Sequence, residues 1–463
     1  MDIPPRRLLA LVLTVAAALR LPGLFTELWL DEIWSVTAVE TLRSPLEVFS
    51  RFKSDNNHHL NSLWIYAVGP GASAAWYRLA AFVSGLAAVV FAWLIGARDG
   101  KPPALVCALL VATCFPLVAY SSETRGYSLV VAFALGAWYF LQRYLDEPGW
   151  RRAWPFWLCT LGGLLSHLTM IYALAGSLAF TREREQRLKK PLLEQALGIP
   201  ALGVALFAVA VWRGTELGGG PPYSLPPVLA DALAYGAGVT AGGVARWLVA
   251  GLFLVAFAVS LGWQVRRGDD RWFFSLVSVV AAPVLVLAVS RPPFLFVRYF
   301  ALQLSLLLLA VGTWVAYGLR LRGTPRLWAI VALSAYLLGN GVALRTFWRE
   351  GRGAHKQALV RMCEETVGRP VTVASDHDFR NRTTLEYHAR SLGPGCRVEY
   401  VPRTALPTDG ADWVILHSLD PDERPRATRL QWGGQRYVFD RSYLAHRLSG
   451  LTWHLYRRAP IAP

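Results

Sequence analysis

An apolar segment over residues 8–24, LLALVLTVAAALRLPGL, is soon followed by Leu28-Trp29-Leu30-Asp31-Glu32-Ile33-Trp34-Ser35. Two adjacent carboxylates, Asp31 and Glu32, therefore lie just beyond the end of an expected membrane helix, where charge is costly unless it is solvated or functional. Tryptophan, present on both sides of the pair, settles at the bilayer–water boundary. An acid held at this depth can reach both a lipid headgroup and an aqueous substrate. The pair is therefore the leading functional candidate.

Composition places the chain among membrane proteins. Of its 463 residues, 54% are hydrophobic and 12% aromatic, and the mean hydropathy is +0.34. An ordinary soluble protein does not have this composition. The net charge of +16 suits cytoplasmic loops and anionic lipid, so we expect no nucleic-acid binding. No small-residue cleavage site follows the first apolar run, which we interpret as a retained helix rather than a signal peptide.

Apolar runs predict the membrane helices, because one span needs about 20 residues. They lie at 8–24, 76–96, 104–119, 127–144, 154–180, 192–212, 247–263, 272–290, 297–317 and 327–344. Basic residues in short loops place the N-terminus in the cytoplasm. The run 154–180 separates two basic loops that both favour the cytoplasm, so we expect two short helices that turn around His167. This division predicts about eleven transmembrane helices and an extracytoplasmic location for everything after residue 345.

Two long outer loops have different compositions. Residues 25–75 contain the acid pair and short apolar pieces, which predict helices lying along the membrane surface. Residues 213–245 are rich in glycine and proline, which predicts an irregular loop.

The composition changes again beyond residue 345. Strands are expected at 371–375, 397–401, 413–417, 436–439 and 451–456, and helices near 354–367 and 381–391. The chain is thus predicted to contain a transmembrane catalytic domain, residues 1–345, and a small extracytoplasmic α/β domain, residues 346–463. Cys363 and Cys396 both fall in the outer domain, where a disulfide is permitted, but two cysteines alone do not establish pairing.

Charged and polar residues gather on the expected outer face. They are Asp31, Glu32, His58, His59, Glu123, Arg125, His167, Arg291 and Arg298. Arginine offers a fixed fork of donors that suits phosphate, so a lipid phosphate is the natural anion. Structural roles are the alternatives: a helix cap for Asp31, a snorkelling or capping role for Arg125, and simple packing for His167. Asp55 with the two adjacent histidines could bind a metal, although no ligand spacing supports it.

The order of short motifs along the chain resembles that of a known family. The motifs, in order, are Leu28-Trp29-Leu30-Asp31-Glu32, Asn57-His58-His59-Leu60, Arg78-Leu79, Ser122-Glu123-Thr124-Arg125-Gly126-Tyr127-Ser128-Leu129, His167 and Arg298-Tyr299. Over roughly residues 8–345 they are similar to the GT-C membrane glycosyltransferases, in particular the protein O-mannosyltransferase and aminoarabinose-transferase type. The sequence departs from the family at His58-His59-Leu60-Asn61, where many members have His-Pro-Pro-Leu-Tyr.

The resemblance implies an inverting hexosyl or pentosyl transfer from a polyprenyl-phosphate sugar, without a nucleotide donor. Asp31 would be the general base that deprotonates the acceptor hydroxyl, and Glu32 would orient the base or its loop. The remaining roles follow the same resemblance. Arg125, Arg298 and Arg291 would hold the donor phosphate, and Glu123, His58, His59, His167 and Tyr127 would contact substrate.

The expected partners are the polyprenyl-phosphate sugar, an acceptor glycan, lipid or protein, and the lipids of the inner membrane. No cofactor is expected; a metal is left open because related oligosaccharyltransferases use one. A transporter or flippase for a lipid-linked or anionic substrate is the competing class, and a non-catalytic scaffold is a third. Few ionisable residues at mid-helix and no visible repeat between the halves argue against a transporter.

Overall fold

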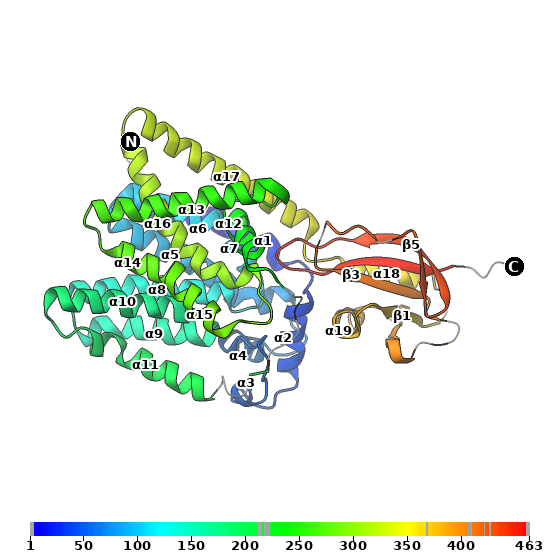
Figure 1. Ribbon diagram of the computed structural model, residues 1–463. Helices are drawn as coiled ribbons and strands as arrows, with labels where there is room; N and C mark the ends of the chain where they lie inside the picture. Colours follow the sequence, from blue (N-terminus) through cyan, green and yellow to red (C-terminus); the bar gives the residue numbers. More distant parts are fainter. Residues whose placement is uncertain are drawn as a thin grey trace. The chain divides into compact units, whose positions relative to one another are not determined.

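Long apolar helices dominate the first 345 residues of the computed structural model (Figure 1). The structure describes residues 4–210, 215–216, 220, 223–366, 369–393, 395–405, 407, 410–420, 422–425 and 427–459. Within these ranges, seven helices are long and apolar enough to cross a membrane. They are α1 (Pro5–Leu24), α5 (Ala74–Ala97), α8 (Tyr127–Asp146), α13 (Gly243–Arg266), the helix over Arg271–Ser290, the helix over Val297–Arg320, and α17 (Thr324–Glu350).

Shorter helices complete this part of the chain. The helix over Arg271–Ser290 comprises α14 (Arg271–Leu276), a π-helical turn (Val277–Ala281) and α15 (Ala282–Ser290), and the one over Val297–Arg320 begins with a 3-10 turn (Val297–Phe300) before α16 (Ala301–Arg320). The others are α2 (Leu30–Glu40), α3 (Glu47–Ser50), α4 (His59–Val68), α6 (Lys101–Thr113), α7 (Phe115–Tyr120), α9 (Trp150–Ser166), α10 (Met170–Leu188), α11 (Leu193–Ala210) and α12 (Leu225–Gly236). The polytopic helical fold is confirmed. The number eleven stays a prediction, since it depends on how many shorter helices cross.

The break expected in the run 154–180 is present. Helix α9 ends at Ser166, and α10 begins at Met170. His167 lies between them in an extended conformation, and its Nδ1 accepts a hydrogen bond from the Thr169 backbone N–H at 3.1 Å. This contact satisfies a donor at the start of α10, as an N-terminal cap does.

The loop 213–245 is more regular than its composition suggests. Residues 213–214, 217–219 and 221–222 lie outside the described residues, but Leu225–Gly236 form α12. Pro226 and Pro227 occupy the first turn of this helix. Proline is well suited to that position, because the first N–H groups of a helix have no partner within it. The expectation of an irregular loop is therefore wrong for these residues.

Two buried arginines cap the C-terminal ends of helices. Arg78 of α5 donates to the carbonyl groups of Gly23 and Leu24, at 3.0 and 3.2 Å. Arg20 of α1 donates to the Ala112 carbonyl, at 2.8 Å, near the end of α6. A cation at a helix C-terminus satisfies unpaired carbonyls and complements the helix dipole. Arg78, which the motif comparison singled out, therefore fixes the end of α1.

The chain forms two compact units. The first contains residues 1–24 and 39–345, and the second contains residues 25–38 and 346–463. The expected division kept residues 25–38 with the transmembrane domain, whereas the structure groups them with the C-terminal residues. His388 donates through Nε2 to the Leu28 carbonyl at 3.0 Å, and the rings of Trp34 and Phe379 pack edge to face at 5.3 Å. These contacts account for the grouping.

A six-stranded mixed sheet forms the centre of the second unit. Its strands are β1 (Val371–Ser375), β2 (Val398–Tyr400), β3 (Trp413–Ser418), β4 (Arg429–Trp432), β5 (Gln435–Tyr443) and β6 (Thr452–Arg458), in the order β2-β1-β3-β6-β5-β4. The first three strands in this order are parallel, and the other pairs are antiparallel. The expected α/β domain is confirmed. Strand β4 was not expected; it pairs with β5 across Gly433 and Gly434, whose positive φ angles suit a tight hairpin.

Helices α18 (His355–Glu364) and α19 (Asp378–Ala389) pack beside the sheet (Figure 1). Their apolar residues join one core with residues of β1, β3 and β6, including the buried Trp413 and Trp453. A smaller core around Val414, Tyr437 and Tyr456 includes other residues of β1, β3, β5 and β6. Cys363 of α18 forms a disulfide with Cys396 before β2, which settles the pairing that the sequence left open.

Candidate functional site

Aromatic rings, histidines and an arginine from separate segments meet in the first unit. We call the set of His58, Arg125, Tyr127, His167 and Tyr299 the aromatic–basic cluster. The ring of His167 lies 5.2 Å from His58, 4.9 Å from Tyr127 and 5.8 Å from Tyr299. The residues come from the position before α4, the turn before α8 and its first residue, the break between α9 and α10, and the 3-10 turn before α16. The fold thus assembles five residues that the sequence motifs had identified.

Arg125 is the most constrained member of the cluster. Its side chain is buried, and Nε donates to Nε2 of His58 at 3.0 Å. Nη2 donates to the Tyr127 hydroxyl at 3.2 Å. The guanidinium therefore has a fixed orientation, which is the property that makes arginine effective at a phosphate.

His58 is neutral in this arrangement. Its Nδ1 lies 3.2 Å from the Ser166 carbonyl oxygen. A carbonyl can only accept, so Nδ1 carries the proton and Nε2 offers its lone pair to Arg125. Burial, reinforced by the positive charge of Arg125, lowers the pKa of His58 well below its ordinary value. Because both nitrogens are engaged, His58 does not fit the metal site considered for residues 55–59.

His59 points to different neighbours. Its ring lies 5.3 Å from both Phe49 and Phe207. Burial lowers the pKa of His59 to about 4, so it is a neutral, packed side chain. In the described part of the chain, its ring contacts do not include the aromatic–basic cluster. A role in binding substrate therefore stays a prediction for this residue.

The turn that carries Arg125 depends on Gly126 and Asn61. A Cβ added at Gly126 would lie 2.0 Å from the Ser166 carbonyl oxygen and 2.8 Å from Nδ1 of His58, so no larger residue fits without displacement. Asn61 of α4 donates to the Thr124 carbonyl at 2.8 Å. Both residues belong to the sequence motifs, but their type and spacing predicted no role for either. They hold the turn against α4 and the end of α9.

The other predicted arginines and Glu123 differ in their surroundings. The Arg298 guanidinium lies 4.0 Å from the centre of the Phe296 ring, and its charge acts on His58. Glu123 is fully buried, and its carbonyl accepts from the Arg125 N–H at 2.8 Å. Arg291 is exposed and ends α15 in a left-handed conformation. Of the three arginines, Arg125 and Arg298 therefore lie at the cluster, and Arg291 is not brought to it among the described residues.

The acid pair belongs to the second unit. Asp31 is half-buried in the first turn of α2. Glu32 is fully buried, and its Oε2 accepts from the Trp29 backbone N–H at 3.3 Å. This contact closes the helix start in the manner of a capping box. The two adjacent acids thus have different surroundings.

Asp31 has charged neighbours that sequence reasoning missed. Arg380 of α19 interacts electrostatically with Asp31 and donates through Nη1 to Nε2 of His417 at 3.0 Å. His417 in turn contacts Asp376 through Nδ1 at 2.7 Å. Burial lowers the pKa of Arg380, and the carboxylates of Asp31 and Asp376 oppose that shift. We call these four residues the Asp31 group.

The Asp31 group lies at the carboxyl ends of two parallel strands. Asp376 follows β1 directly, and His417 is near the end of β3. Side chains at this edge of a parallel sheet are commonly used to bind ligands. Asp376 directly follows the expected strand 371–375, and His417 ends the expected strand 413–417. The sequence therefore contained a signal for both residues, namely their position at a strand end.

A cavity of about 500 Å³ lies away from these residues and is not the candidate site. Its lining includes Arg271, which pairs with Asp99 at 2.8 Å, and Arg184, which pairs with Asp270 at 2.6 Å. These charges lie at helix ends and turns that the basic-residue pattern predicts to be cytoplasmic. They are satisfied by one another, as expected for a structural network.

Neither a protein-family model nor a curated protein matches the sequence. Solved structures do match the fold. The apo crystal structure of ArnT from Cupriavidus metallidurans has a TM-score of 0.51 and 14% identity, covering 88% of this chain and 92% of that one. The Archaeoglobus fulgidus oligosaccharyltransferase, in complex with Zn and sulfate, has a TM-score of 0.51 and 12% identity, covering 88% and 67%. At such identities the likeness describes the fold.

Proposed function

The chain has the fold of the GT-C membrane glycosyltransferases, and on this premise we propose that it transfers a sugar from a polyprenyl phosphate to an acceptor hydroxyl. One observation carries the proposal: Arg125 and Arg298 both lie at the aromatic–basic cluster of this fold. Arginines suit the donor phosphate, and aromatic rings offer flat apolar faces for a sugar. The polytopic helices give the lipid part of the donor an apolar environment.

The proposed reaction is a single displacement with inversion. Asp31 takes the proton of the acceptor hydroxyl, and the oxygen attacks the anomeric carbon of the donor sugar. The bond between that carbon and the phosphate oxygen breaks, and the polyprenyl phosphate leaves with the electron pair. Arg125 and Arg298 stabilise the negative charge on the leaving phosphate.

The two acids have separate tasks in this proposal. Asp31 is the catalytic residue, and Arg380 positions its carboxylate by electrostatic attraction. Glu32 is a positioning residue, because its carboxylate closes the helix turn that carries Asp31. The proposed location is the extracytoplasmic face of the inner membrane, with the N-terminus in the cytoplasm, as the basic loops indicate.

The test uses the full-length protein in lipid nanodiscs with a panel of polyprenyl-phosphate sugars. Consumption of one donor by the wild type identifies the sugar. Asp31→Asn should abolish transfer while the protein keeps its thermal unfolding midpoint, because the carboxamide has the same shape but cannot act as the base. Glu386→Gln, at an exposed residue of α19, is the control and should keep full activity.

Reconstituted vesicles separate this proposal from transport. The wild type should release polyprenyl phosphate and glycosylate a hydroxyl acceptor. Movement of the intact donor across the bilayer without cleavage, unchanged by Asp31→Asn, would instead identify a flippase.

A further inference from the structure

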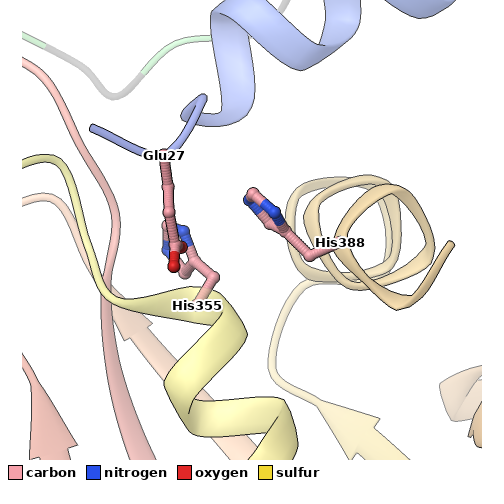
Figure 2. A group of neighbouring side chains, drawn as sticks. All are labelled: Glu27, His355 and His388. Atoms are coloured by element: carbon pink, nitrogen blue, oxygen red, sulfur yellow. The ribbon is translucent and has the colours of Figure 1, made fainter. Parts of the chain in front are cut away.

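A second polar group of the second unit lies outside the Asp31 group. Glu27, His355 and His388 come from the segment before α2, the first residue of α18 and the end of α19. One oxygen or nitrogen of each lies within 4.8 Å of the others. Figure 2 shows the Glu27 carboxyl group beside His355, with the ring of His388 directed toward them. Both histidines are buried, with exposed fractions of 0% and 1%.

The hydrogen bonds of the two histidines define which nitrogens can bind a ligand. Nε2 of His355 lies 2.9 Å from the Leu451 carbonyl oxygen, and Nε2 of His388 lies 3.0 Å from the Leu28 carbonyl oxygen. Since a carbonyl only accepts, each Nε2 carries the proton and each Nδ1 presents a lone pair. Both Nδ1 atoms are buried and have no hydrogen-bond partner among the described residues.

This pattern is characteristic of histidines that bind metal ions. A ligating imidazole almost always donates its other N–H to a carbonyl or carboxylate, which fixes the tautomer and the ring orientation. Two such rings beside one carboxylate offer two nitrogens and one oxygen. That combination is found at zinc sites that keep a fourth position for water.

We propose that Glu27, His355 and His388 bind one zinc ion. Neighbouring ligand atoms of tetrahedral zinc lie roughly 3.4 Å apart, given bond lengths of about 2.1 Å. The observed group, within 4.8 Å, needs only a modest contraction to reach this geometry. Zinc is favoured over magnesium or calcium because imidazole nitrogens supply most of the ligands.

The alternative role of Glu27 is to cap α18. Its Oε2 accepts from the Lys356 backbone N–H at 3.1 Å. A carboxylate has about four lone-pair positions, so capping and metal binding are compatible. Capping accounts for the carboxylate, but it does not explain why two buried histidines beside it each keep an Nδ1 without a hydrogen-bond partner among the described residues.

The zinc ion, with water as its fourth ligand, would hold parts of the second unit together. It would join the segment that precedes α2 to α18 and α19, and so fix the chain close to Asp31 without entering the transfer reaction. The inference is independent of the proposed glycosyl transfer, because it concerns metal content and stability.

The test measures zinc in the full-length protein purified in detergent without chelator. Elemental analysis should give about one zinc per chain, and X-ray absorption should show nitrogen and oxygen neighbours. His355→Gln and His388→Gln should each lower zinc affinity by more than about tenfold. His446→Gln replaces a buried histidine outside the group and should keep the metal.

The Glu27→Gln variant tests whether weaker zinc binding could be caused by misfolding. The amide oxygen can still cap α18, so the variant should fold but bind zinc more weakly. Adding zinc to chelator-stripped protein should raise the unfolding midpoint of the wild type and of His446→Gln, and much less that of the ligand variants. A stripped wild type that takes up no zinc at micromolar concentrations, or ligand variants that bind zinc as tightly as the wild type, would overturn the proposal.

Discussion

The Glu32 carboxylate accepts a hydrogen bond from the Trp29 backbone N–H, with 3.3 Å between Oε2 and N. Glu32 is the third residue of α2, and Trp29 directly precedes the helix. The side chain thus reaches back over the first turn and satisfies a donor that has no partner within the helix. Asp31 lies in the same turn, so the position of its carboxylate depends on the turn that Glu32 closes.

Replacing Glu32 should therefore affect stability as well as activity. We expect Glu32→Ala to lower the free energy of unfolding by about 1–2 kcal/mol, because it removes a buried cap. Glu32→Gln, which keeps an oxygen acceptor, should recover most of this loss and much of the transfer rate. The measurements are the thermal unfolding midpoint and the rate of transfer. An inactive Glu32→Gln of full stability would assign the carboxylate a direct catalytic role instead.

Arg125 and Arg291 offer a matched comparison of two arginines. Arg125→Gln removes a buried, oriented cation, and should weaken donor binding by about 2 kcal/mol, a factor of roughly 30 in KM. Arg291→Gln changes an exposed side chain and should alter KM less than about twofold. Steady-state kinetics with varied donor concentration test both. Equal effects of the two substitutions would contradict a special role for the aromatic–basic cluster.

The second unit should lose stability in mild acid through His446. Burial, together with the positive charge of Arg352, lowers the pKa of His446 from its ordinary 6.5 to about 4. Between these values the unfolded chain binds a proton that the folded chain does not, so stability falls as pH falls from 6.5 toward 4. At pH 5 the loss is about 2 kcal/mol from this group.

The comparison of His446→Gln with the wild type isolates that contribution. The variant should show a smaller drop in its unfolding midpoint between pH 7 and pH 5, because glutamine does not titrate. An identical pH dependence in the two proteins would show that other groups account for the effect.

Local sequence signals predicted the regular elements well. Apolar runs marked the long helices, and the charge pattern indicated the break at His167, which the structure shows as the junction of α9 and α10. Short apolar stretches at 371–375 and 413–417 marked β1 and β3. These features depend on neighbours within the same segment, so periodicity and composition suffice to find them.

Features that depend on distant partners were missed. Strand β4 is short, and its side chains are partly exposed, so it lacks a strong apolar pattern and is formed by pairing with β5. The electrostatic interaction between Arg380 and Asp31 joins residues that are far apart in the chain. The same is true of Glu27, His355 and His388, whose spacing matches no metal-binding motif. Residue type alone did not distinguish Arg125 from Arg291, because burial decides between them.

Residues 25–38 fold with the C-terminal sheet although they come from the beginning of the chain. A chimaera that exchanges only residues 346–463 with another protein would remove the partners of Leu28 and Trp34. Engineers who wish to transplant this part of the protein should move both stretches together as a discontinuous cassette. During biosynthesis, the acid-bearing segment cannot reach these neighbours until Phe379 and His388 have been synthesised.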